Sequence, residues 1–203
     1  VPLQTSTGGD LRVSGKADFL QALGLTTALG SGATPIGATR ATSVATLGNL
    51  VSDGATLNVN GKTITFRNAI VPAASATHTG VTGKLETDGN GNSTVYLQTA
   101  TVADVLKAID IATGVRTVTL ASGGATANVA AGETASSVNS SGVLNISTGS
   151  ATDLNITSTG NALSVLGLNG PTGSGTSFTA SRTPGTGGIN GKTLTFSSFN
   201  CGT

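Results

Sequence analysis

The sequence predicts an α+β fold, mostly β, in which short antiparallel hairpins and sheets accompany one main amphipathic helix at residues 101–112. Two observations carry this prediction. Apolar residues recur convincingly at helical spacing in the stretch TVADVLKAIDIATG, residues 101–114, whereas short segments elsewhere alternate apolar and polar residues. A single helix cannot bury its apolar stripe alone. We therefore expect the alternating segments to form the sheet on which the helix packs.

Both ends of this helix carry capping signals. Thr101 can cap the first turn together with Asp104, and Gly114 can adopt the left-handed conformation that ends a helix. The apolar stripe is expected to comprise Val102, Val105, Leu106, Ile109 and Ala112. Asp104, Lys107 and Asp110 fall on the opposite side, which we expect to be a solvated face with no separated carboxylate pair for catalysis.

The other elements follow in chain order. Residues 1–25 predict two short strands, around Leu3 and Leu11, and then a helical turn capped by Asp18. The segment TLNVNGKTITF predicts a hairpin at 55–66, because Asn-Gly accepts the positive φ angles of a type I′ turn. The remaining expected elements are a strand within the loop 67–84, a turn at 87–92, strands at 93–99, 115–120, 126–130, 142–147 and 152–157, and a helical turn at 161–166.

An internal repeat organises the chain. Residues 1–25 match residues 144–168 at a constant offset without a gap, and Asn60-Gly-Lys-Thr-Ile-Thr-Phe66 recurs as NGKTLTF at 190–196. We therefore read one complete copy at about 46–168, flanked by the tail and the head of others, and we expect two lobes related by the repeat. One lobe is residues 46–168, and the other combines residues 1–45 and 169–203. Alternatively, both ends are cut edges of a longer repeat array.

The segments that join the repeat copies are rich in Gly, Pro, Ser and Thr. Residues 26–43 and 169–188 have this composition and are predicted to be linkers or surface loops.

Composition limits the classes of function. Charged residues make up 9% of the 203 residues, the net charge is +1, and the cations form no cluster that would bind nucleic acid or an anionic membrane. No stretch is apolar over a membrane span. The single cysteine, Cys201, can form no internal disulfide and is expected to be incidental. A hydroxyl-rich, charge-poor chain of this kind suggests an extracellular protein.

The sequence offers few candidates for chemistry. Glu86, Asp88 and Asn90 imitate the start of an acidic calcium loop, but Leu97 stands where the bidentate Glu is needed, so a turn between strands is the favoured interpretation. His78, the single histidine, is expected to be a surface-loop residue. No nucleophile elbow or phosphate-binding loop occurs in a convincing context. We therefore predict no enzyme activity, no cofactor, and no catalytic, cofactor-binding or metal-binding residues.

The run from GATLNVNGKTITF through TVADVLKAIDIATGV to SGVLNISTGSATDLNIT and NALSVLGL resembles the flagellin IN motif. This motif occurs in the variable outer domains of bacterial flagellins and in filament-cap and hook-associated proteins. Ile109-Asp110 replaces the Ile-Asn of the family pattern, and Cys201 is a departure because flagellins generally avoid cysteine. The phrases LGLTTALGSGATP and ATSVATLGNL resemble the long flagellins of alphaproteobacteria.

The resemblance implies a structural role in the bacterial flagellum. The chain would be the surface-exposed outer domain of a secreted flagellin that contributes to the filament surface and serves motility, with 46–168 as the distal lobe and the two ends as the shaft-proximal lobe. Its partners would be other flagellin subunits, assembled through coiled-coil termini that are not in this chain. O-linked glycans are compatible with the exposed Ser and Thr, whereas nucleic acid and membrane are not expected partners. The alternatives are a carbohydrate- or surface-binding module of a secreted adhesin, or a filament cap or hook-associated protein.

Overall fold

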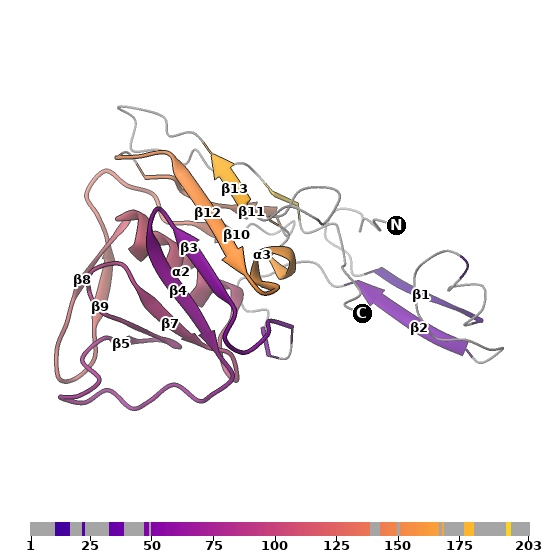
Figure 1. Cartoon of the computed structure of the whole chain (residues 1–203), viewed down its shortest axis with the longest axis horizontal. Helices are drawn as coiled ribbons and strands as arrows, with labels where there is room; N and C mark the ends of the chain where they lie inside the picture. Colours follow the sequence, from indigo (N-terminus) through magenta and orange to yellow (C-terminus); the bar gives the residue numbers. More distant parts are fainter. Residues whose placement is uncertain are drawn as a thin grey trace.

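The structure is a computed structural model that describes residues 11–16, 22, 33–38, 47–48, 50–138, 143–149, 151–166, 168, 177–180 and 194–195. The described residues form short strands in several small sheets around one long helix, which confirms the predicted α+β, mostly β, class (Figure 1).

A mixed seven-stranded sheet is the centre of the fold. Its order is β13-β12-β3-β4-β7-β6-β5, and all neighbours are antiparallel except β4 and β7, which are parallel. The strands are β3 (Thr56–Val59), β4 (Lys62–Arg67), β5 (Val81–Thr82), β6 (Leu85–Thr87), β7 (Ser93–Tyr96), β12 (Leu154–Thr159) and β13 (Ser177–Ala180). The strands predicted at 93–99 and 152–157 are thus present with slightly different bounds.

The hairpin of β3 and β4 turns at Asn60-Gly61 as predicted. Both residues have positive φ, 49° and 82°, and Val59 lies opposite Lys62 across the turn. The loop that follows β4 returns to the sheet through the short strands β5 and β6. Because the chain passes through this excursion before β7, β7 can lie parallel to β4.

Alternation along the strands places one set of apolar side chains in the core. In β3 and β4 the buried positions are Leu57, Val59, Ile64 and Phe66, each with no exposed surface. Ile156 of β12 lies opposite Val59 and joins the same cluster. This period of two is what a strand with one buried face requires.

The helix α2 (Val102–Thr113) packs against this sheet, and its ends are those predicted. The carboxylate of Asp104 accepts hydrogen bonds from the backbone N–H of Thr101 at 2.9 Å and from its hydroxyl at 2.8 Å. Gly114 adopts the left-handed conformation with φ 81°. Local sequence signals thus set both limits of the helix.

The buried part of α2 is wider than the predicted stripe. Ala108, Asp110 and Ile111 are also buried, because β8 (Arg116–Thr119) and β10 (Ser137–Val138) contact the helix in addition to the sheet. The expectation that Asp110 lies on a solvated face with Asp104 and Lys107 is therefore wrong, since its side chain is only 1% exposed.

Three smaller sheets complete the described residues. β8 pairs with β9 (Thr126–Val129), and the hairpin that they form lies beside β5, where the N–H of Ala125 donates to the carbonyl of Val81 at 2.7 Å. β10, β11 (Val143–Asn145) and β14 (Leu194–Thr195) form a three-stranded sheet. A short helix, α3 (Ala162–Val165), follows β12 and confirms the helical turn predicted at 161–166.

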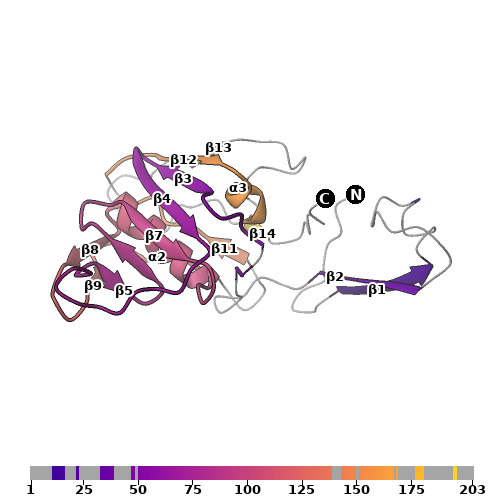
Figure 2. The same cartoon turned by 60° about the horizontal axis from the view of Figure 1, so that its bottom comes forward.

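The third sheet pairs β1 (Leu11–Lys16) with β2 (Ala33–Ala38) and lies apart from the larger body (Figure 2). Its register repeats that of β12 and β13. Val13 lies opposite Ile36 as Ile156 lies opposite Phe178, and Leu11 lies opposite an alanine as Leu154 does. The internal repeat read from the sequence therefore extends to strand pairing.

Two expectations about segment boundaries need correction or stay open. β2 and β13 lie within 26–43 and 169–188, so these stretches are not linkers or loops throughout. Alternating SFTA suits a strand, and Pro35 is tolerated because β2 is at an edge. Most of 1–45 and 169–203 lies outside the described residues, so the two-lobe division stays a prediction. Where the latter segment is described, β13 and β14 pair with strands of 46–168.

Candidate functional site

The acidic segment after β6 forms a turn. Asp88 Oδ1 accepts from the backbone N–H of Asn90 at 2.8 Å and of Asn92 at 3.1 Å, and Oδ2 accepts from Asn92 Nδ2 at 2.7 Å. Partial burial raises the pKa of Asp88, but these hydrogen bonds and the charge of Lys62 outweigh it and hold the pKa below its ordinary value. The carboxylate thus organises the turn between β6 and β7, as the favoured interpretation predicts.

Glu86 points away from this turn and joins two side chains that the sequence does not group. His78 Nδ1 lies 2.9 Å from Glu86 Oε1, and the hydroxyl of Tyr96 donates to Glu86 Oε2 at 3.0 Å. Burial raises the pKa of Tyr96, and the hydrogen bond and charge of Glu86 add to the effect. His78 is 42% exposed, so it lies on a surface loop as expected, but it is tied to the sheet through Glu86.

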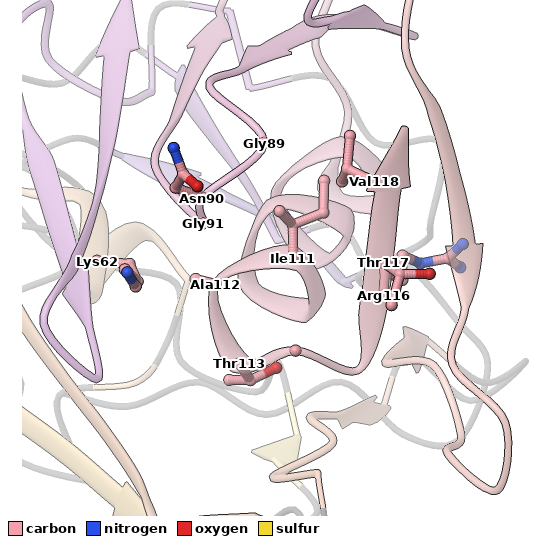
Figure 3. A pocket seen from close by; sticks show the side chains of 11 residues that line it. Lys62, Gly89, Asn90, Gly91, Ile111, Ala112, Thr113, Arg116, Thr117 and Val118 are labelled. Carbon is pink, nitrogen blue, oxygen red and sulfur yellow. The ribbon is translucent and has the colours of Figure 1, made fainter. Parts of the chain in front are cut away.

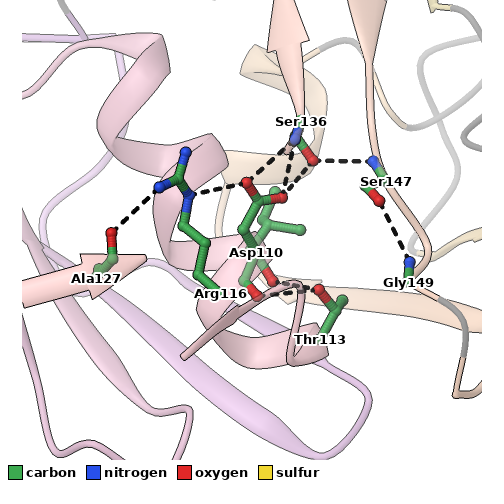
Figure 4. A network of polar contacts seen from close by, with 8 residues as sticks. Asp110, Thr113, Arg116, Ala127, Ser136, Ser147 and Gly149 are labelled. Carbon is green, nitrogen blue, oxygen red and sulfur yellow. Dashed lines mark hydrogen bonds and ion pairs between the residues drawn. The ribbon is translucent and has the colours of Figure 1, made fainter. Parts of the chain in front are cut away.

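Asp110 is the centre of a buried polar network (Figure 4). Its carboxylate accepts from the hydroxyl of Ser136 at 2.6 Å and from the N–H of Ser136 at 3.1 Å, and Arg116 Nε donates to it at 3.3 Å. The network continues because the N–H of Ser147 donates to the hydroxyl of Ser136 at 2.9 Å. These bonds join the end of α2 to β8 and to the segments before β10 and after β11.

Burial sets the electrostatics of this network. Desolvation raises the pKa of Asp110 above its ordinary value, and the bonds from Ser136 and the charge of Arg116 reduce the shift without cancelling it. Arg116 also donates to the carbonyl of Ala127 at 3.3 Å. The side chains of Asp110, Ser136 and Arg116 thus bind one another. Their hydrogen bonds fix the packing of α2 against β8 and against the segments before β10 and after β11.

A groove of about 460 Å³ lies beside this network. It is lined by Lys62, the turn 89–91, the end of α2 at 111–114, and β8 residues 116–118 (Figure 3). Its two cations differ in availability, because Arg116 is already bound to Asp110 and Ala127. No aromatic side chain is among the lining residues, so the groove lacks the platform expected of a carbohydrate-binding module.

The other features considered in the sequence are a single cysteine, possible metal ligands and possible membrane spans. Cys201 lies outside the described residues. Within the described part of the chain, no group of three or more His, Cys, Asp and Glu side chains lies close enough to hold a metal ion. None of the helices in the described residues combines the length and the apolar character needed to cross a membrane. The two clusters around Glu86 and Asp110 escaped sequence reasoning because their bonded partners are 6 to 26 residues apart and share no motif.

Comparison with known proteins gives one match. No curated protein and no solved structure matches the chain significantly. A family model described as Domain of Unknown Function (DUF1522) matches residues 5–203, which is nearly the whole chain. The chain therefore belongs to the DUF1522 family.

Proposed function

We propose that this chain is a surface-exposed outer domain of a bacterial flagellin and acts as a structural component of the flagellar filament. It works outside the cell, next to other flagellin subunits, and carries no catalytic site. One observation carries the proposal. The segments that resemble the IN motif, namely the β3–β4 hairpin, α2 and β12 with α3, are distant in sequence but form one continuous core.

Two further features support a structural role. The buried carboxylate of Asp110 is occupied by Arg116 and Ser136, which hold it in the packing of the fold. The surface depends on hydroxyls and amides, because only 9% of the residues are charged. Such a surface suits a densely repeated exterior, where like charges on neighbouring subunits would repel.

The proposal is tested by labelling filaments on living cells of the source bacterium with a maleimide dye. In a Cys201→Ser background, Thr119→Cys and Thr157→Cys place thiols at exposed positions of two different strands. The matched control is Ser93→Cys, because Ser93 is 6% exposed and its hydroxyl has no hydrogen-bond partner to lose. Dye along whole filaments for the exposed variants, and not for the control, is the expected result.

Other labelling patterns distinguish the alternatives. Dye confined to the filament tip would indicate a cap protein, and dye at the hook would indicate a hook-associated protein. Dye on the cell body beside bare filaments would overturn the flagellar proposal and favour an adhesin module.

A further inference from the structure

The dipeptide Asn-Gly occurs at two described turns, and the first of them is firmly held. At the β3–β4 turn, Asn60 Nδ2 donates to Thr152 Oγ1 at 3.1 Å, and Asn60 Oδ1 accepts from the N–H of Asn155 at 2.7 Å. The next N–H in the chain, that of Gly61, donates to Asn58 Oδ1 at 3.0 Å. Both the amide of the Asn side chain and the nitrogen that follows it are therefore engaged.

The second Asn-Gly, at the β6–β7 turn, is held differently. Asp88 binds the backbone N–H of Asn90, and Asn90 is exposed at the edge of the groove (Figure 3). Neither the side chain of Asn90 nor the N–H of Gly91 has a hydrogen-bond partner among the described residues. In this second turn, therefore, no hydrogen bond within the described residues holds the side-chain amide of Asn90 or the backbone nitrogen of Gly91.

The turn also requires a residue without a side chain at position 91. A Cβ at Gly91 would lie 2.9 Å from Cγ of Lys62, and the φ angle of Gly91 is 105°. These constraints keep glycine at this position. Gly91 is buried beside the side chain of Lys62, so the difference between the two sites lies in their hydrogen bonds and not in solvent exposure of the glycine.

From this contrast we propose that Asn90 is a deamidation site of the folded chain, whereas Asn60 is protected. The nitrogen of Gly91 attacks Cγ of Asn90, so a new N–C bond forms while the bond from Cγ to Nδ2 breaks. The proton of the Gly91 nitrogen leaves with Nδ2 as ammonia, which gives a succinimide. Water then opens the ring at either carbonyl, leaving aspartate or isoaspartate at position 90.

The product changes the turn in a defined way. A new carboxylate stands two residues from Asp88, whose own oxygens organise the turn. Isoaspartate also adds a methylene to the backbone between β6 and β7. The modification therefore lowers the net charge of the chain by one and weakens the turn at the edge of the groove, where Lys62 is the nearby cation.

The test is to age the purified full chain in mildly alkaline buffer and to follow both sites by mass spectrometry of tryptic peptides. Cleavage after Lys62, Lys84 and Lys107 puts Asn60 and Asn90 in separate peptides. Three hydrogen bonds hold the side chain of Asn60 and the nitrogen of Gly61, so we expect Asn90 to react at least about tenfold faster than Asn60. In urea, which removes the structural difference, the two rates should converge. Equal rates in the folded chain, or a faster Asn60, would overturn the proposal.

The variant Asn58→Ala tests the protecting role directly. It frees the N–H of Gly61, so the rate at Asn60 should rise severalfold while Asn90, in the same sample, serves as the reference. A urea unfolding curve of the variant establishes that it is folded under the ageing conditions. An unchanged rate at Asn60 in the folded variant would contradict protection by this hydrogen bond.

Discussion

Replacing Asp110 by alanine should destabilise the chain strongly, although this residue looks like part of a solvated helix face in the sequence. The change removes the acceptor of three donors: the N–H and hydroxyl of Ser136 and Nε of Arg116. At roughly 1 kcal/mol for each lost hydrogen bond, the loss is about 3 kcal/mol. Relief from burying a carboxylate with a raised pKa offsets part of it, so we expect a net loss of about 2 kcal/mol.

The assay is urea unfolding followed by circular dichroism at neutral pH, supported by thermal melting. For a chain of this size, a loss of about 2 kcal/mol corresponds to a fall in Tm of roughly 4–8 °C. Asp53→Ala is the matched control, because Asp53 is an exposed acid that accepts one hydrogen bond, from the N–H of Asn68. It should cost less than about 1 kcal/mol. If both variants lose the same free energy, the buried network does not hold the fold as described.

Three further predictions concern the ionisation of Asp110, the contacts of Glu86 and the turn at Gly61. Asp110→Asn should gain stability relative to the natural chain as pH rises. A carboxyl whose pKa is raised in the folded state stabilises that state fully below the unfolded pKa of 3.8, and this contribution is lost as pH rises through the folded pKa. Urea unfolding curves at several pH values measure the free energies of both chains, and a variant that loses stability relative to the natural chain as pH rises contradicts the prediction. Glu86→Ala should cost about 1 kcal/mol and speed amide exchange in the loop 68–80, measured by hydrogen–deuterium exchange, since His78 loses its tie to the sheet. Gly61→Ala should cost about 1 kcal/mol in urea unfolding from its φ of 82° alone, because open space surrounds the new methyl group; no loss would show that the turn adjusts freely.

Elements with strong local signals could be predicted from the sequence. The capping pair Thr101 and Asp104 and the stop at Gly114 are contacts within a few residues, and Asn60-Gly61 carries its turn in two letters. Each signal is local, because its physical cause acts between neighbours in the chain. The strands with alternating apolar residues follow for the same reason.

The buried polar clusters could not be predicted in this way. Asp110 is buried because β8 and β10 contact the helix in addition to the sheet, and the spacing of residues along the helix does not predict these contacts. Glu86 resembled a calcium ligand next to Asp88, yet its side chain turns to His78 and Tyr96. The alternation of residues in the sequence predicts on which face of a strand a side chain lies, but tertiary packing decides which other side chain it binds.

The central claim is that the chain belongs to the exterior of a flagellar filament, and immunogold electron microscopy tests it most directly. Antibodies raised against this chain are applied to cells of the source bacterium and to filaments sheared from them. The proposal predicts gold along the whole length of the filaments in both samples. Gold on the cell body, with bare filaments, would contradict it.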